Sequence, residues 1–78
     1  MTTLIARQQH TIGRIVTLHE GPVRRGWSVA LSSIKRAHVR AMTKAGYTVQ
    51  EAWASVRDCT DMARLEILCR GSNPSIDL

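Results

Sequence analysis

The residues that could perform catalysis are few, and their spacing does not assemble a catalytic or metal site. The chain has three histidines, His10, His19 and His38, and two cysteines, Cys59 and Cys69. No His-x-x-x-His or Cys-x-x-Cys spacing occurs, so a zinc site is not expected. A glycine-rich phosphate loop is also missing. We therefore expect no catalytic residue, no metal and no cofactor.

The individual candidates have structural interpretations. His38 and Cys59 fall on apolar stripes of expected helices, which predicts a buried histidine and an inert buried thiol. Asp58 and Asp61 stand beside arginines on an outer helix face and look like surface ion pairs. We expect a protein that is not an enzyme.

The basic residues carry the stronger signal, because they are distributed unevenly. The formal net charge is +5 and the pI is near 10.3, which favours a polyanionic partner. Residues 1–50 hold eight basic residues against one acid, whereas residues 51–78 hold three against five. This asymmetry predicts that the first part contacts the partner and the second part supports it.

One basic stripe has helical spacing. Arg36, Arg40 and Lys44 recur every four residues, so they share a helix face and could contact successive phosphates. A solvated helix face is the alternative, but no acid lies between Arg24 and Lys44. The expected phosphate-binding residues are Arg24, Arg25, Lys35, Arg36, Arg40 and Lys44.

The expected elements are strands followed by helices. The segment Thr11–Leu18 is rich in β-branched residues and favours a strand, although its apolar residues also fit a helix. Trp27–Leu31 alternates and predicts a strand with Trp27, Val29 and Leu31 on one face.

Two helices are expected after these strands. Ser32 or Ser33 caps the first, over about 33–45, and Gly46 ends it. The spacing Thr48-Val-Gln-Glu51 is a capping box that opens the second, over about 49–70. The predicted fold class is a small α+β domain, with one or two N-terminal strands followed by two helices. It is one domain over 1–78, with flexible ends at 1–10 and 72–78.

The small core favours a homodimer. Phe is absent, and a chain of this length buries a modest fraction of its surface. The end of the second helix is apolar on both sides, so a second subunit or the N-terminal segment must cover it. The expected oligomer interface comprises Trp27, Val29, Leu31, Met62, Leu65 and Leu68.

The order of elements over about Arg25 to Val56 resembles the ribbon-helix-helix family of bacterial and phage repressors. The resemblance rests on a strand ending at Leu31, Gly46 fifteen residues later, and Thr48 opening the next helix. It implies that two chains pair their strands into a ribbon in the DNA major groove. It also implies that Ser28 faces the bases and that Thr48 lies near a phosphate. Ser is a poor base reader, which is a departure from the family's pattern.

These observations together predict a small DNA-binding regulatory protein, repressor-like and dominated by contacts to the phosphate backbone. A helix-turn-helix with Thr48 onward as recognition helix is less favoured, because its acids would repel DNA. The rival class is a protein-interaction module, such as a small phage-type inhibitor or accessory factor that binds a host protein through Met62, Leu65 and Leu68. A membrane partner is not expected, since the basic helix lacks an aromatic anchor. The two cysteines are too far apart on one helix for a disulfide, and no signal peptide is evident, which favours a cytoplasmic protein.

Overall fold

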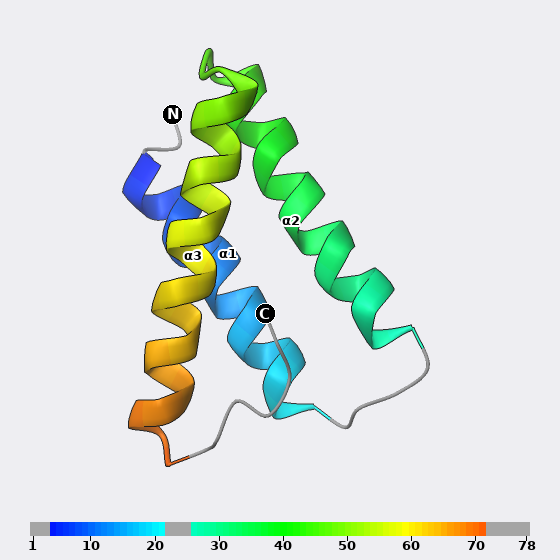
Figure 1. The fold of residues 1–78 in the computed structure, drawn as a ribbon, viewed down its shortest axis with the longest axis vertical. Coiled ribbons are helices and arrows are strands. Elements are labelled where there is room, and N and C mark those ends of the chain that lie inside the picture. The colour runs from blue at the N-terminus through cyan, green and yellow to red at the C-terminus, as the bar shows by residue number, and fades with distance from the viewer. Residues whose placement is uncertain (1–3, 22–25, 72–78) are drawn as a thin grey trace.

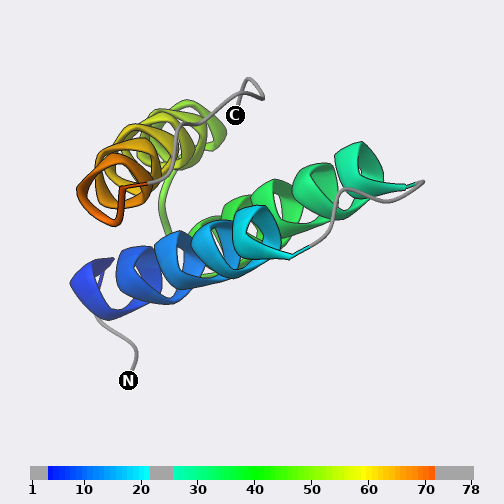
Figure 2. The same ribbon diagram turned by 90° about the horizontal axis from the view of Figure 1, so that it is seen from below.

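The chain forms a bundle of three helices in a computed structural model that describes residues 4–21 and 26–71 (Figure 1). The helices are α1 (Leu4–Glu20), α2 (Trp27–Lys44) and α3 (Val49–Cys69), and each packs against the other two. Figure 2 shows α1 and α2 side by side, with α3 lying across one side of that layer. The described residues contain no strand, so the predicted α+β class is wrong and the fold is all-helical.

The first predicted strand is the middle of α1. Thr11, Ile15 and Val16 are buried at helical spacing, and Ile12 packs against the same core. The β-branched content of this segment misled the strand prediction. Its intrinsic helix penalty is a few tenths of a kcal/mol per residue, whereas burying one such side chain contributes about 1.5–3 kcal/mol. Residues Leu4 to His10, expected to be a flexible end, form the first turns of α1.

The second predicted strand is the start of α2, which begins at Trp27 and not at Ser33. Trp27, Leu31 and Ile34 are buried with a spacing of four and three residues, whereas Val29 is 73% exposed. A strand would have placed Val29 on the same face as Trp27 and Leu31. The Trp27 indole Nε1 donates a hydrogen bond of 3.2 Å to the Leu18 carbonyl, which anchors the start of α2 against the end of α1.

The turn between α2 and α3 follows the sequence signals closely. Gly46 has φ 105°, the left-handed conformation that ends a helix. Thr48 then caps α3: its hydroxyl accepts from the Glu51 amide at 3.1 Å, and the Glu51 carboxylate accepts from the Thr48 amide at 3.0 Å. The capping box that the sequence predicted is confirmed.

A hydrophobic cluster joins the three helices. Ile15 and Val16 of α1 meet Ile34 of α2 and Ala63 and Ile67 of α3, with Trp27 and Leu31 completing the cluster. These side chains are at most 7% exposed. Their packing sets the angle between the helices and thereby fixes which side chains remain on the surface.

A buried polar cluster centres on His38 and draws residues from all three helices. The His38 ring is fully buried, with Nδ1 2.6 Å from the Thr11 hydroxyl and Nε2 2.9 Å from the Ser55 hydroxyl. Gln8 donates a further hydrogen bond of 3.1 Å to the Ser55 hydroxyl. Burial, and then the nearby Arg7 guanidinium, lower the pKa of His38. Because the ring stays neutral and fully bonded, this cluster specifies the helix register without a buried charge.

Candidate nucleic-acid interface

Exposed cations from two helices gather on one surface, which we call the cationic face and define as Arg14, Arg36, Arg40 and Lys44. Arg14 belongs to α1 and the other three belong to α2. All four side chains are exposed. The α2 residues lie one turn apart, so their Cβ atoms are separated by about 5–6 Å along the helix.

A shallow groove lies between α1 and α2, and Arg14 is the member of the cationic face that lines it. Its α1 wall also includes His10, Gly13 and Thr17, and Ser33 stands on its α2 wall. Ser33 also borders the hollow on α2 that Arg36 and Arg40 line, so the two hollows adjoin at this residue. No α3 residue lines the groove.

The carboxylates of the described residues lie away from the cationic face. Asp61 pairs with Arg64, and Arg70 pairs with both Glu20 and Glu66. Glu51 is engaged by the Thr48 amide, which lowers the pKa of its carboxyl group, and Asp58 lies on the same helix. Except for Glu20 at the end of α1, every described acid is on α3. The cationic face therefore keeps its positive potential.

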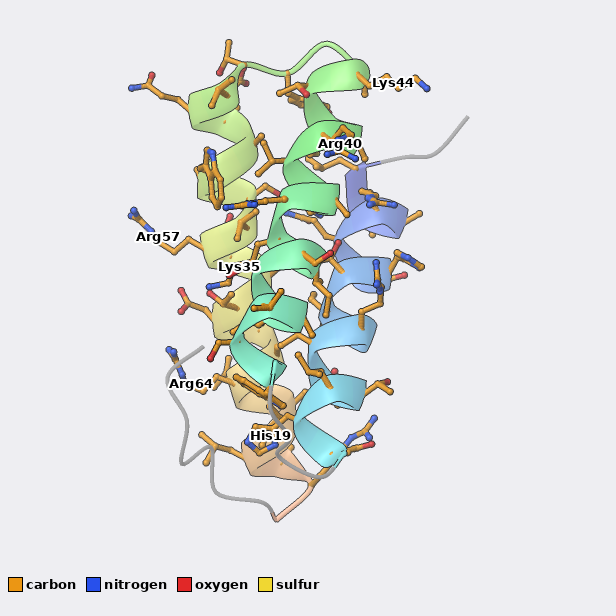
Figure 3. All side chains as sticks on the ribbon, turned by 90° about the vertical axis from the view of Figure 1, so that its right-hand side faces the viewer. His19, Lys35, Arg40, Lys44, Arg57 and Arg64 are labelled. Carbon is orange, nitrogen blue, oxygen red and sulfur yellow. The ribbon has the colours of Figure 1, made fainter. Side chains whose placement is uncertain are left out.

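The structure separates Lys35 from the other predicted phosphate-binding residues. Figure 3 shows Lys35 on the side of α2 nearest α3, where it shares a surface with Arg57 and Arg64, while Arg40 and Lys44 project elsewhere. Adjacent residues of a helix point about 100° apart, so Lys35 and Arg36 cannot share a face. Arg24 and Arg25 lie outside the described residues.

The two residues implied by the ribbon-helix-helix resemblance occupy other settings. Ser28 is exposed in the first turn of α2 and borders the same hollow as Arg36. The Thr48 amide and hydroxyl are both paired with Glu51, whose carboxylate takes the place that a phosphate would need. Because residues 27–31 are helical, they offer no strand for an intermolecular ribbon.

The predicted oligomer interface is divided between the core and the surface. Trp27 and Leu31 are buried within one chain. Val29 is exposed on α2. Met62, Leu65 and Leu68 are 54%, 57% and 50% exposed on α3, so the N-terminal helix α1 does not cover them, and their role at an oligomer interface stays a prediction.

Sequence reasoning did not single out Arg14 as a binding residue. Arg14 joins Arg36 and Arg40 only because α1 is helical and packs beside α2. With residues 11–18 interpreted as a strand, nothing placed Arg14 near them. The available signal was the lack of any acid before Glu20, which leaves Arg14 without a neighbouring carboxylate on α1.

The histidine and cysteine side chains do not form a reactive centre in the described residues. The His38–Ser55 pair is buried and bonded on both sides. Cys59 is also buried, and its pKa is raised by desolvation and then by the Asp58 carboxylate, which disfavours the thiolate. No group of three potential metal ligands occurs within residues 4–21 and 26–71. Nor does any helix in those ranges have the length and apolar character needed to cross a membrane.

Comparison with known proteins gives no further guidance: no family model, no curated protein and no solved structure matches this chain.

Proposed function

We propose that this chain binds duplex DNA through the cationic face, mainly by contacts to the phosphate backbone, as a small regulatory or repressor-like protein. The observation that carries the proposal is the set of four exposed cations from two packed helices, with no described carboxylate among them. Phosphates on one DNA strand follow one another at short, regular intervals, which suits cations spaced one helical turn apart.

The chemistry of the face suits an anionic partner such as a phosphate backbone. Arginine presents a planar fork of donors that matches the oxygens of a phosphate group. Small residues such as Gly13 and Ser33 leave the groove between the helices open, so a sugar–phosphate backbone could approach closely. Phosphate contacts fix position without reading sequence, so we expect binding that tolerates many base sequences.

The test is an anisotropy titration of a labelled duplex of about 20 base pairs at several salt concentrations. Four phosphate contacts predict a slope of about −3 to −4 in the plot of log affinity against log salt. Arg36→Gln with Arg40→Gln should weaken binding by about tenfold or more and flatten the slope by about 2. The matched control is Arg57→Gln with Arg64→Gln, which removes the same charge from α3 and should retain most of the affinity.

Several outcomes would contradict the proposal. The chain could fail to bind duplex at low salt, or bind with an affinity that salt does not change. Equal losses in the two double variants would show that only net charge matters and that the cationic face is not the site. Circular dichroism of each variant checks that the helices are intact.

A further inference from the structure

A second groove, between α1 and α3, has the opposite chemical character. Its wide end is lined by Ile12 of α1 and by Met62, Leu65 and Cys69 of α3. A second hollow lies farther along α3, where Leu4 of α1 and Met42 and Tyr47 join Ala54 and Asp58 in the lining. The two hollows have no lining residue in common, but Asp58 and Met62 lie one turn apart, so both hollows follow one face of α3. We call this surface the acidic–apolar groove.

The apolar side chains of this groove are poorly covered. Met62 and Leu65 are each more than half exposed, and Ile5, one turn before Gln9 on the same side of α1, is 67% exposed. Large apolar side chains gathered in one groove, rather than scattered singly, mark an interaction surface.

The spacing of the α3 residues indicates what shape of partner would fit this groove. Glu51, Ala54, Asp58, Met62, Leu65 and Cys69 all line the groove, separated by steps of three, four, four, three and four residues. This spacing follows the period of the α-helix, so these side chains form one seam along a single face of α3, the arrangement by which one helix packs along another. From Glu51 to Cys69 the seam is about 27 Å long, enough for five turns of a partner helix.

The charges around the groove indicate the partner's polar residues. The acids Glu51, Asp58 and Glu66 line it, and no described Lys, Arg or His does. At its α1 edge the polar residues are the uncharged Gln8 and Gln9. Glu66 is paired with Arg70, which leaves Glu51 and Asp58 as carboxylates without an ionic partner among the described residues. This acidic border stands out in a chain of net charge +5.

We propose that the acidic–apolar groove binds an amphipathic helix of a partner protein, with an apolar stripe flanked by lysine or arginine. The apolar stripe packs on Ile12, Met62 and Leu65, and the flanking cations lie against Asp58 and Glu51. This surface uses none of the residues of the cationic face, so the proposal does not depend on DNA binding.

A second copy of this chain is a poorer occupant. Another acidic–apolar groove would bring the same carboxylates toward Asp58 and Glu51. The exposed cations of α2 do lie on one face, but Val29 is the one large apolar side chain that α2 exposes. The basic helix α2 therefore presents no apolar stripe between its cations.

The test uses two synthetic helical peptides with the same leucine stripe, one flanked by lysines and one flanked by glutamates. We expect the full chain to bind the lysine peptide in a saturable 1:1 complex by calorimetry, and the glutamate peptide at least about tenfold more weakly. Met62→Ser with Leu65→Ser should reduce affinity for the lysine peptide by about tenfold or more. Val29→Ser removes a more exposed apolar side chain from α2 and should leave that affinity unchanged. Asp58→Asn should reduce the difference in affinity between the lysine peptide and the glutamate peptide.

The proposal is overturned if neither peptide binds, if the two bind equally well, or if Val29→Ser weakens binding as much as the groove variant. It is also overturned if sedimentation shows that the chain self-associates and that Met62→Ser with Leu65→Ser makes it monomeric, because a second copy would then be the occupant. If the unaltered chain binds duplex DNA but neither peptide, the proposal for this groove fails and the proposal for the cationic face stands.

Discussion

The two flanks of α1 face grooves of opposite chemistry. Toward α2, Arg14 borders a groove with small side chains, and Arg36 and Arg40 border the adjoining hollow on α2; no described carboxylate lines either one. Toward α3, Ile12, Met62 and Leu65 form an apolar groove bordered by acids. Gly13 lines both grooves and marks the ridge between them.

This comparison shows how a charge division along the chain becomes a division in space. The basic residues of the first fifty positions fall on α1 and α2, and most acids fall on α3. Because α3 packs across one side of the α1–α2 layer, the opposite side of that layer remains cationic (Figure 2). The sum of charges alone could not distinguish this arrangement from a uniformly basic surface.

The largest expected effect is a loss of folding stability, because unfolding removes both surfaces together. Ile67 is 1% exposed in the cluster that joins α3 to α1 and α2. We expect Ile67→Ala to lower the free energy of unfolding by about 2–5 kcal/mol, a large fraction of the stability of so small a domain. Urea unfolding measures the loss. Leu65→Ala, an exposed position on the same helix, should change stability by less than about 0.5 kcal/mol, and a comparable loss there would contradict this description of the core.

Lowering the pH should reduce the folding stability of the chain, because His38 is buried where the three helices meet. The pKa of His38 is lowered in the folded chain, so the unfolded chain binds the additional proton more readily. Stability is therefore complete above the ordinary histidine pKa of about 6.5 and is lost as the pH falls below it toward the folded value. Urea midpoints measured between pH 7.5 and 5 should decline. His38→Gln should reduce that decline, and an unchanged pH dependence in this variant would show that another group is responsible.

A smaller effect should act on α3 alone. Thr48→Ala removes the side-chain half of the capping box and should cost about 1 kcal/mol. Thr17→Ala, an exposed position within α1, is the matched control and should be close to neutral. Thermal unfolding followed by circular dichroism distinguishes them, and equal shifts in the two variants would argue against the cap.

The smallest predicted effect is a gain in stability at the ridge between the grooves. A Cβ added at Gly13 meets no atom within 4 Å, and glycine is a poor residue in a helix interior. Gly13→Ala should therefore raise the free energy of unfolding by about 0.5–1 kcal/mol and leave the affinities for the duplex and for the lysine peptide unchanged. A loss of stability would show that α1 is not a regular helix at this position.

The sequence predicted the second half of this fold better than the first. Local signals decide the turn at Gly46 and the cap at Thr48, and both were read correctly because each depends on two or three neighbouring residues. The helices at Thr11–Leu18 and Trp27–Leu31 depend on tertiary burial, which outweighed the local preference for strand. The basic stripe of α2 was recognised from its spacing, whereas the place of Arg14 beside it required the packing of α1 against α2.

The most direct test of two separate surfaces is to titrate one set of variants with both probes, the duplex and the lysine-flanked peptide. Arg36→Gln with Arg40→Gln should weaken duplex binding by about tenfold or more and leave peptide binding unchanged, since the two grooves share no charged residue. Met62→Ser with Leu65→Ser should have the reverse pattern. If either double variant weakens both ligands equally while its helices and unfolding midpoint match the unaltered chain, the division of this protein into a cationic face and an acidic–apolar groove is wrong.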